Sequence, residues 1–248
     1  MKIFSTKVDK VTEKVIEVNK GIGALTFRTE KTLDTLNSEK INIQIQRSNG
    51  DNIEITNGSV PLKDFLVLGT MNENAIGCDT KNNYAVKATI ALVEHDMCSI
   101  HLHEKDLLRI AFTGLDNTKT YELDGHEAPL STDDIYSYQR KSMNSEHENM
   151  DFDVAGYDCC IITDDSSINE INLKFDNGAV VKTTPAELRD LQESVDPIAQ
   201  VNLDGTVLAS FVDFIQIPLK GIVSINIRKE QDEIINLLMR HDVDITNL

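Results

Sequence analysis

Two histidines separated by one residue, His101 and His103, form the pattern in the sequence that is best suited to chemistry. In a β-strand, residues two positions apart point to the same face, so both imidazoles could bind one metal ion. Glu104 follows directly and would point to the opposite face, and His126 is the next histidine along the chain. Two interpretations stay open: a metal site at His101 and His103, or two histidines of a surface or an interface.

Closely spaced aspartates are candidates of a second kind, for calcium, which prefers oxygen ligands. The pairs are Asp151 and Asp153, Asp164 and Asp165, and Asp242 and Asp244. Subunits this acidic repel one another where they meet unless cations screen them, so calcium at subunit contacts is one interpretation. Solvated acidic loops are the other.

Motifs of nucleophilic and nucleotide chemistry are absent from the sequence. It contains no G-x-S-x-G and no C-x-x-C, and Gly21-Ile22-Gly23 lacks the spacing of a phosphate-binding loop. The four cysteines, of which Cys159 and Cys160 are adjacent, suit reduced thiols better than a disulfide framework. We therefore predict that the protein is not an enzyme and has no catalytic residue and no resident cofactor.

The charge of the chain limits its partners. The 248 residues include 41 acidic and 24 basic side chains, a formal net charge of −17. Phosphate binding needs a basic surface, so we expect no direct contact with nucleic acid. A basic excess in the first 20 residues leaves room for a peripheral contact with a membrane. No stretch approaches the roughly 20 apolar residues of a membrane span, and the N-terminal residues do not resemble a secretory signal.

The elements that must position these residues are mainly β-strands, and one arrangement of them occurs twice. Residues 41–66 and 170–191 each contain two strands joined by an Asn-Gly turn, followed by a helix that begins near a proline. Later, the lysine-led alternating segments 105–112 and 220–227 agree in the same order, each after another β-rich run (99–103 and 211–217). About eight strands in each half indicate sandwich or jelly-roll topology.

A polar stretch, Ser131–Met150, divides the two halves and predicts a linker or crossover loop. We accordingly place the first domain at residues 1–130 and the second at residues 151–248. The first predicted strand is Val15–Val18. The last segment, Glu233–Met239, fits neither the period of a strand nor that of a helix, so both stay open.

With these two acidic β-domains in tandem, each with a helix in its middle, the chain resembles the double jelly-roll major capsid proteins of membrane-containing icosahedral phages, the PM2-like family. The units at 41–66 and 170–191 and the strand Gly221–Arg228 carry this resemblance. It implies an all-β fold of two tandem eight-stranded jelly rolls, each with a short inserted helix.

The resemblance also implies a function. Three copies would form a homotrimer whose six jelly rolls give a pseudo-hexagonal outline that tiles a shell around an internal membrane and a double- or single-stranded DNA genome. The partners would be neighbouring capsomers, a penton protein, minor membrane-associated virion proteins and, peripherally, the internal membrane. The protein would be located in the virion after assembly in the host cytoplasm. Two alternatives stay open: a metal-dependent bicupin-like enzyme built on His101 and His103, and a carbohydrate-binding or spike-type β-sandwich module.

Overall fold

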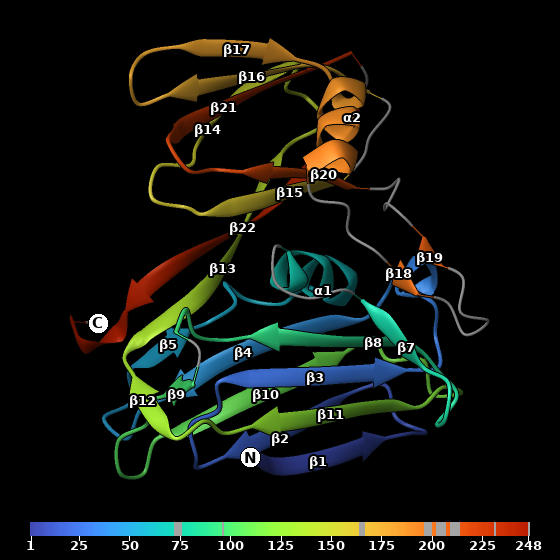
Figure 1. The fold of residues 1–248 in the computed structure, drawn as a ribbon, viewed down its shortest axis with the longest axis vertical. Coiled ribbons are helices and arrows are strands. Elements are labelled where there is room, and N and C mark those ends of the chain that lie inside the picture. Colours follow the sequence, from blue (N-terminus) through green and yellow to red (C-terminus); the bar gives the residue numbers. More distant parts are fainter. Residues whose placement is uncertain are drawn as a thin grey trace. The chain divides into compact units, whose positions relative to one another are not determined.

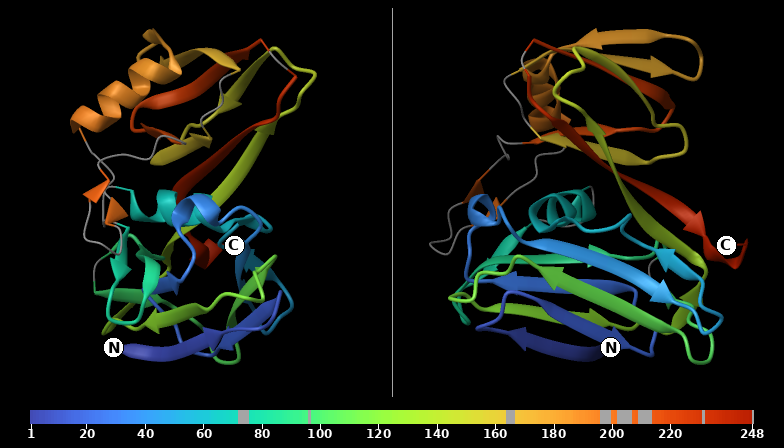
Figure 2. Two further views of the ribbon diagram at one scale, coloured as in Figure 1. Left: turned by 90° about the vertical axis from the view of Figure 1, so that its right-hand side faces the viewer. Right: turned by 180° about the vertical axis from the view of Figure 1, so that it is seen from behind.

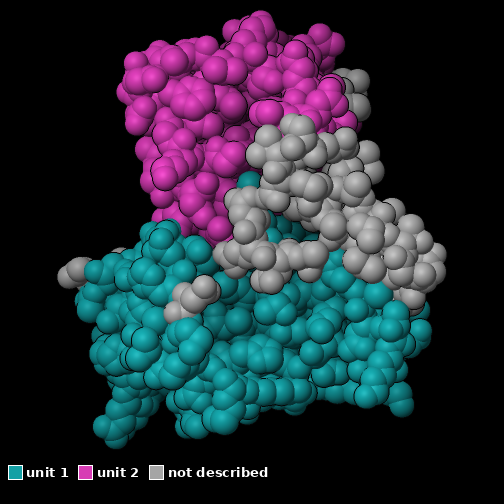
Figure 3. All heavy atoms as spheres, in the orientation of Figure 1, with its two compact units in different colours: residues 1–138, 199–208, 242–248 teal, residues 139–198, 209–241 magenta. Residues whose placement is uncertain are grey.

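The computed structural model describes residues 1–71, 76–95, 97–163, 167–195, 200–201, 207–208, 214–230 and 232–247. The chain forms two compact units, shown in teal and magenta in Figure 3. The first unit contains Met1–Tyr138, Ala199–Leu208 and Asp242–Leu248, and the second contains Gln139–Ile198 and Ala209–His241. Both units are built from β-strands, as the sequence predicted.

Eight strands of the first unit alternate between two antiparallel sheets (Figure 1). One sheet has the order β1-β11-β3-β8 and the other β2-β10-β4-β5, so the sequence of strands is first-eighth-third-sixth and second-seventh-fourth-fifth. This interleaved order defines a jelly roll. The strands are β1 (Lys2–Val8), β2 (Lys14–Val18), β3 (Ala24–Thr29), β4 (Lys40–Gln46), β5 (Asn52–Glu54), β8 (Tyr84–Ala91), β10 (Leu107–Thr113) and β11 (Tyr121–His126).

The second unit repeats the same order of strands, as the labels of Figure 1 show, and Figure 2 gives two further views of these strands. Its sheets are β13-β22-β15-β20 and β14-β21-β16-β17, which again read first-eighth-third-sixth and second-seventh-fourth-fifth. The predicted double jelly roll is therefore confirmed. The strands are β13 (Asp134–Met143), β14 (Asn149–Asp153), β15 (Cys159–Thr163), β16 (Ile168–Phe175), β17 (Val180–Thr183), β20 (Phe214–Pro218), β21 (Ile222–Lys229) and β22 (Ile235–Asp244).

Short elements supplement the two jelly rolls. β7 extends a sheet beside β8, β6 pairs with β4, β9 and β12 form a parallel pair, and β18 pairs with β19. Their bounds are β6 (Val60–Pro61), β7 (Gly77–Asp79), β9 (Cys98–Ile100), β12 (Leu130–Thr132), β18 (Gln200–Val201) and β19 (Val207–Leu208), with 3-10 helices η1 (Leu33–Thr35) and η2 (Ile245–Asn247).

The alternation of apolar and polar side chains explains why these segments form strands. In β4, Ile41, Ile43 and Ile45 are at most 1% exposed, whereas the intervening Asn42 and Gln44 lie on the outer face. This is the period of two expected of a sheet with one buried face. In the second unit, β15 and β20 are buried on both faces, which explains why their sequences are almost continuously apolar.

Each jelly roll carries one α-helix between its fifth and sixth strands, as predicted. α1 (Leu62–Thr70) packs against β8 and β4, and α2 (Pro185–Val195) packs against β20 and β16. The partners are the sixth and fourth strands in both units. α2 begins with a capping box, in which the Thr184 amide donates to Glu187 (2.9 Å) and the Glu187 amide to the Thr184 hydroxyl (3.3 Å). α1 has no such side-chain cap, since its N-cap is Pro61. Neither described helix is long and apolar enough to cross a membrane.

Two predictions were wrong, one strand was missed, and the open question about the last segment has an answer. The predicted linker 131–150 is wrong, because it contains β13 and the start of β14, and the buried Tyr136 and Tyr138 hold β13 in place. The run 99–103 is not equivalent to 211–217, because β9 stands outside the eight strands whereas β20 is the sixth. The last segment is a strand, β22, and β1 was not predicted. Parts of the runs 201–203 and 206–216 lie outside the described residues.

The close approach of Gly21 to β9 yields a prediction. A Cβ atom at Gly21 would lie 1.7 Å from the Ile100 carbonyl oxygen, whereas a Cβ at Gly77 would meet nothing within 4 Å. We expect Gly21→Ala to lower the free energy of unfolding by about 1–3 kcal/mol, because backbone must move. Gly77→Ala, the matched control, should change it by less than about 0.5 kcal/mol. Thermal unfolding checks both, and equal midpoints for the two variants would contradict the predicted close contact.

Candidate functional site

The structure brings His101 and His103 together, although not on a strand. β9 ends at Ile100, so both histidines lie in the exposed segment that follows it. Their ring centres are 4.7 Å apart and the ring planes are tilted by 57°. His101 Nδ1 lies 3.1 Å from Asp133 Oδ1. The adjacency that the sequence predicted is thus present, but in an irregular segment that leads from β9 into a turn at His103–Asp106, and not in a strand.

Asp106 anchors the turn that carries these histidines. This buried carboxylate accepts hydrogen bonds from the amides of His103 (3.2 Å) and Ser48 (3.0 Å). It thereby joins the connection after β9 to the connection after β4. Glu104 follows His103 and is exposed. The other candidate ligand, His126, belongs to β11, where its Nε2 lies 2.9 Å from the Thr26 hydroxyl and burial lowers its pKa.

The candidate calcium ligands are engaged with neighbouring groups of their own unit. Asp151 accepts from Asn226 (3.1 Å), and Asp153 accepts from the amide of Ala155 (3.1 Å). Asp244 accepts from the amide of Thr246 at 2.9 Å, and this lowers its pKa together with the Thr246 hydroxyl bond. Asp164 and Asp165 lie outside the described residues. Within the part of the chain that the structure describes, no three His, Cys, Asp or Glu side chains are grouped to hold a metal ion.

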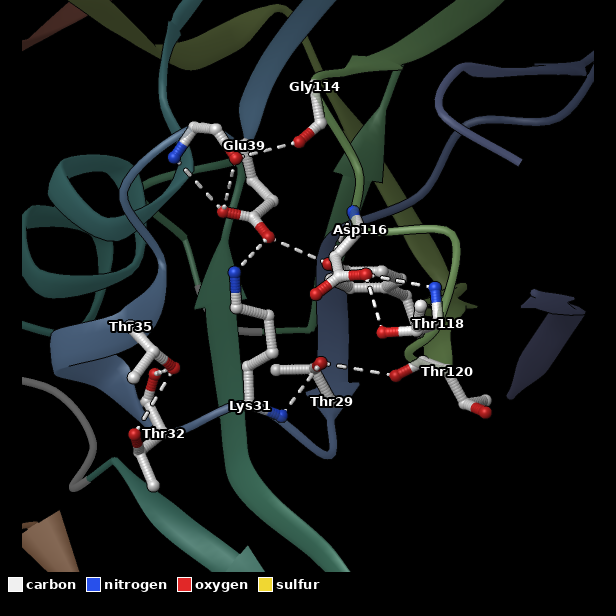
Figure 4. Close-up of polar contacts among 11 residues, drawn as sticks. Thr29, Lys31, Thr32, Thr35, Glu39, Gly114, Asp116, Thr118 and Thr120 are labelled. Atoms are coloured by element: carbon white, nitrogen blue, oxygen red, sulfur yellow. Dashed lines mark hydrogen bonds and ion pairs between the residues drawn. The ribbon is translucent and has the colours of Figure 1, made fainter. Parts of the chain in front are cut away.

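Among the described residues of the first unit, the carboxylate of Glu39 belongs to the most deeply buried charged side chain, and Figure 4 shows its contacts. It accepts from the Lys31 ammonium (2.6 Å) and from the Tyr121 hydroxyl (2.7 Å). Tyr121 in turn accepts from the Asp116 amide (3.0 Å). These bonds join the connection between β3 and β4 to the connection between β10 and β11.

Electrostatics around Glu39 favour the charged form. Burial by itself would raise the pKa of this carboxyl, but the bonds from Lys31, Tyr121 and a backbone amide outweigh it and hold the pKa below its usual value. Burial and the Glu39 carboxylate raise the pKa of Tyr121, which stays a neutral donor. Gly114 completes the junction: its φ of +69° suits glycine, and a Cβ there would lie 2.2 Å from the Ser38 carbonyl oxygen. This network serves the structure and has no exposed reactive group.

The adjacent thiols of Cys159 and Cys160 are both buried in β15. Burial raises the pKa of each far above the usual value of a thiol, so neither forms the thiolate that nucleophilic chemistry requires. Among the described residues, His101 and His103 form an exposed pair of chemically active side chains, and the half-buried Asp133 contacts His101. The sequence singled out the two histidines but not Asp133, because nothing in the spacing of residues 32 positions apart predicts their contact.

Comparison with known proteins identifies the fold. No protein-family model matches the sequence, and no curated protein matches it. Among solved structures, the major capsid protein P2 of bacteriophage PM2 matches with 12% identity and a TM-score of 0.52, over 96% of this chain and 97% of that one. A chain of the Sulfolobus turreted icosahedral virus structure matches with 8% identity and a TM-score of 0.57, over 97% and 90%. Both are double jelly-roll viral capsid proteins, and this chain has their fold over almost its full length.

The Glu39 network yields a prediction about acid stability. Glu39→Gln leaves the Lys31 ammonium buried without its counter-charge, so we expect a loss of about 3 kcal/mol of unfolding free energy at neutral pH. Because the folded pKa of Glu39 lies below the usual 4.5, its contribution is present above that pH and is lost as the pH falls through the folded pKa. The difference in melting temperature between wild type and variant should therefore shrink with acidification.

Glu54→Gln is the matched control, since Glu54 is exposed and accepts one 3.3 Å bond from Asn42. We expect its melting temperature to follow that of the wild type at every pH. The double variant Lys31→Met with Glu39→Gln should recover part of the lost stability, because it removes the unpaired charge. Equal stability of Glu39→Gln and Glu54→Gln at pH 7 would show that the network does not stabilise the fold.

Proposed function

We propose that this chain is a major capsid protein of an icosahedral virus and acts by building a shell rather than by catalysis. One observation carries the proposal: a single chain contains two complete jelly rolls with the same strand order and the same helix position, and this arrangement matches the PM2 capsid protein over 96% of its length. The match extends to a viral capsid chain of an archaeal host, so the fold does not by itself specify a phage.

In the proposed shell, three copies form a trimer with a pseudo-hexagonal outline, because each copy contributes two similar domains. We extend the proposal to an internal membrane beneath the shell, to a DNA genome, and to penton and minor virion proteins as partners. The acidic chain suits a shell that does not touch the genome, since it lacks the excess of basic residues that phosphate contacts need.

In each jelly roll, the sheet of the second, seventh, fourth and fifth strands has a polar outer face, which suits a hydrated contact between subunits. In the second unit, Asn172 donates to Asn226 (3.3 Å), and Asn226 donates to Asp151 (3.1 Å), which forms a polar ladder across three strands. The first unit has Asn42 and Gln44 on the corresponding strand. Polar, hydrogen-bonded faces are typical of the outer parts of protein–protein interfaces, where water remains.

The bicupin alternative finds no support in the geometry. His101 and His103 lie in an exposed segment outside the eight strands of the first jelly roll, so they do not line the interior of its sandwich. No observation on the described residues favours a sugar-binding platform, and we therefore advance no second function.

The proposal predicts the assembly of the purified protein. Light scattering coupled to size exclusion should give about 83 kDa, three times the 27.7 kDa chain, and negative-stain images should show pseudo-hexagonal particles. Since copies that carry a net charge of −17 repel one another, the trimer fraction should rise between ~0.01 M and ~0.15 M salt. A monomer in low salt, in high salt and in millimolar calcium chloride would refute the capsid function.

A further inference from the structure

We propose that His101 and His103 bind one divalent transition-metal ion of the zinc type, with Asp133 as a positioning residue. This inference concerns a site in the first unit and does not rest on the proposed capsid function.

The separation of the two rings matches that of imidazoles on a shared ion. Zinc binds a histidine nitrogen at about 2.0–2.1 Å, which puts the ion roughly 3.2 Å from each ring centre, so rings that meet at tetrahedral or somewhat smaller angles have centres about 4.5–5.3 Å apart. The observed distance between centres is 4.7 Å. The 57° tilt also shows that the rings are not stacked face to face.

Asp133 determines which nitrogen of His101 is available. Its carboxylate only accepts hydrogen bonds, so Nδ1 of His101, 3.1 Å away, must carry the proton. The lone pair of His101 then lies on Nε2, where a metal ion can bind. A carboxylate that orients a ligating histidine in this way is a common outer partner in metal sites and strengthens binding.

Hydrogen bonds hold the backbone of both histidines, and their side chains are accessible to solvent. Asp106 fixes the His103 amide, and the Thr132 carbonyl accepts from the His101 amide (2.9 Å), so both ligands start from defined positions. The His101 side chain is 43% exposed, and His103 is exposed too, which lets an ion enter from solvent. The acidic surroundings attract cations, whereas the imidazole donors select transition metals over calcium or magnesium.

The two histidines supply half of a tetrahedral set. Because the described residues contain no group of three metal-binding side chains, the other two positions fall to water or to side chains of a second copy of this chain. These two sources differ in stoichiometry, since a shared ion gives fewer than one ion per chain.

The connection that precedes β9 supplies a matched control. His95 is also exposed and also lies near an aspartate, with Nε2 3.8 Å from Asp134 Oδ2. Asp133 contacts His101, which pairs with the His103 ring, whereas His95 contacts the next residue, Asp134. His95→Ala should therefore leave metal binding unchanged.

The experiment is calorimetric titration of the full-length, tag-free protein with zinc chloride, alongside calcium chloride. We expect zinc to bind at up to one ion per chain and calcium to give no binding that depends on the histidines. His101→Ala and His103→Ala should each abolish the zinc signal, and Asp133→Asn should weaken the affinity about tenfold or more. Bound cobalt should show the visible absorption of a tetrahedral nitrogen site.

Several results would overturn the inference. It fails if the wild type takes up no zinc, if His101→Ala or His103→Ala binds as the wild type does, or if His95→Ala removes binding equally. Circular dichroism of every variant shows whether the fold is retained. Because these residues are exposed, the variants should unfold at the temperature of the wild type without metal. One ion for every two or three chains supports the inference and assigns the missing ligands to a second copy.

Discussion

The eighth strand of each jelly roll lies between the first and the third, and without it the first strand has no partner in the sheet. β11 fills this place in the first unit and β22 in the second. Residues of β1 and β11 that pair are more than one hundred positions apart, and those of β15 and β22 are about 75–81 positions apart, which makes these pairs costly in chain entropy. Gly125 shows how tightly the first closure is made: a Cβ there would lie 2.1 Å from the Phe4 ring. Because Gly125 has no side chain, β1 can approach β11 at this position.

The first and last strands of the second jelly roll both extend into the first unit. Its first strand, β13, starts among residues of the first unit, and its last strand, β22, ends among them. There the Ile245 amide donates to the Asp133 carbonyl (2.9 Å), and the Arg47 guanidinium donates to the Ile245 carbonyl (2.7 Å). The segment that enters the second unit and the segment that leaves it are thus tied together within the first unit. Residues 131–150 therefore contain β13 and the start of β14 in place of a linker.

What the sequence could predict follows from the range of the contacts. The segments 41–66 and 170–191 were recognised as a repeat because a hairpin turn and a helix start are local signals, and they correspond to β4–β5–α1 and β16–β17–α2. The seventh strands, β10 and β21, were recognised from their alternation. β1 was missed because its partner is distant and its half-buried side chains alternate poorly. β13 was missed because its region is polar on average, although its apolar side chains Ile135, Tyr136 and Tyr138 are buried.

The same reasoning applies to the sites, and it distinguishes the two ends of the first jelly roll. Connections alternate between the ends of an antiparallel sandwich, so those after β3 and β10 share one end, and those after β4 and β8 share the other (Figure 1). At the first end, the Glu39 carboxylate bonds Tyr121, 82 residues away, and is fully buried. At the second end, the exposed His101 side chain contacts Asp133. Neither contact has a signature in sequence, because only the order of strands brings these loops together. Since a buried, satisfied charge cannot take up a ligand without losing its partner, we assign the Glu39 network to stability and not to ligand binding.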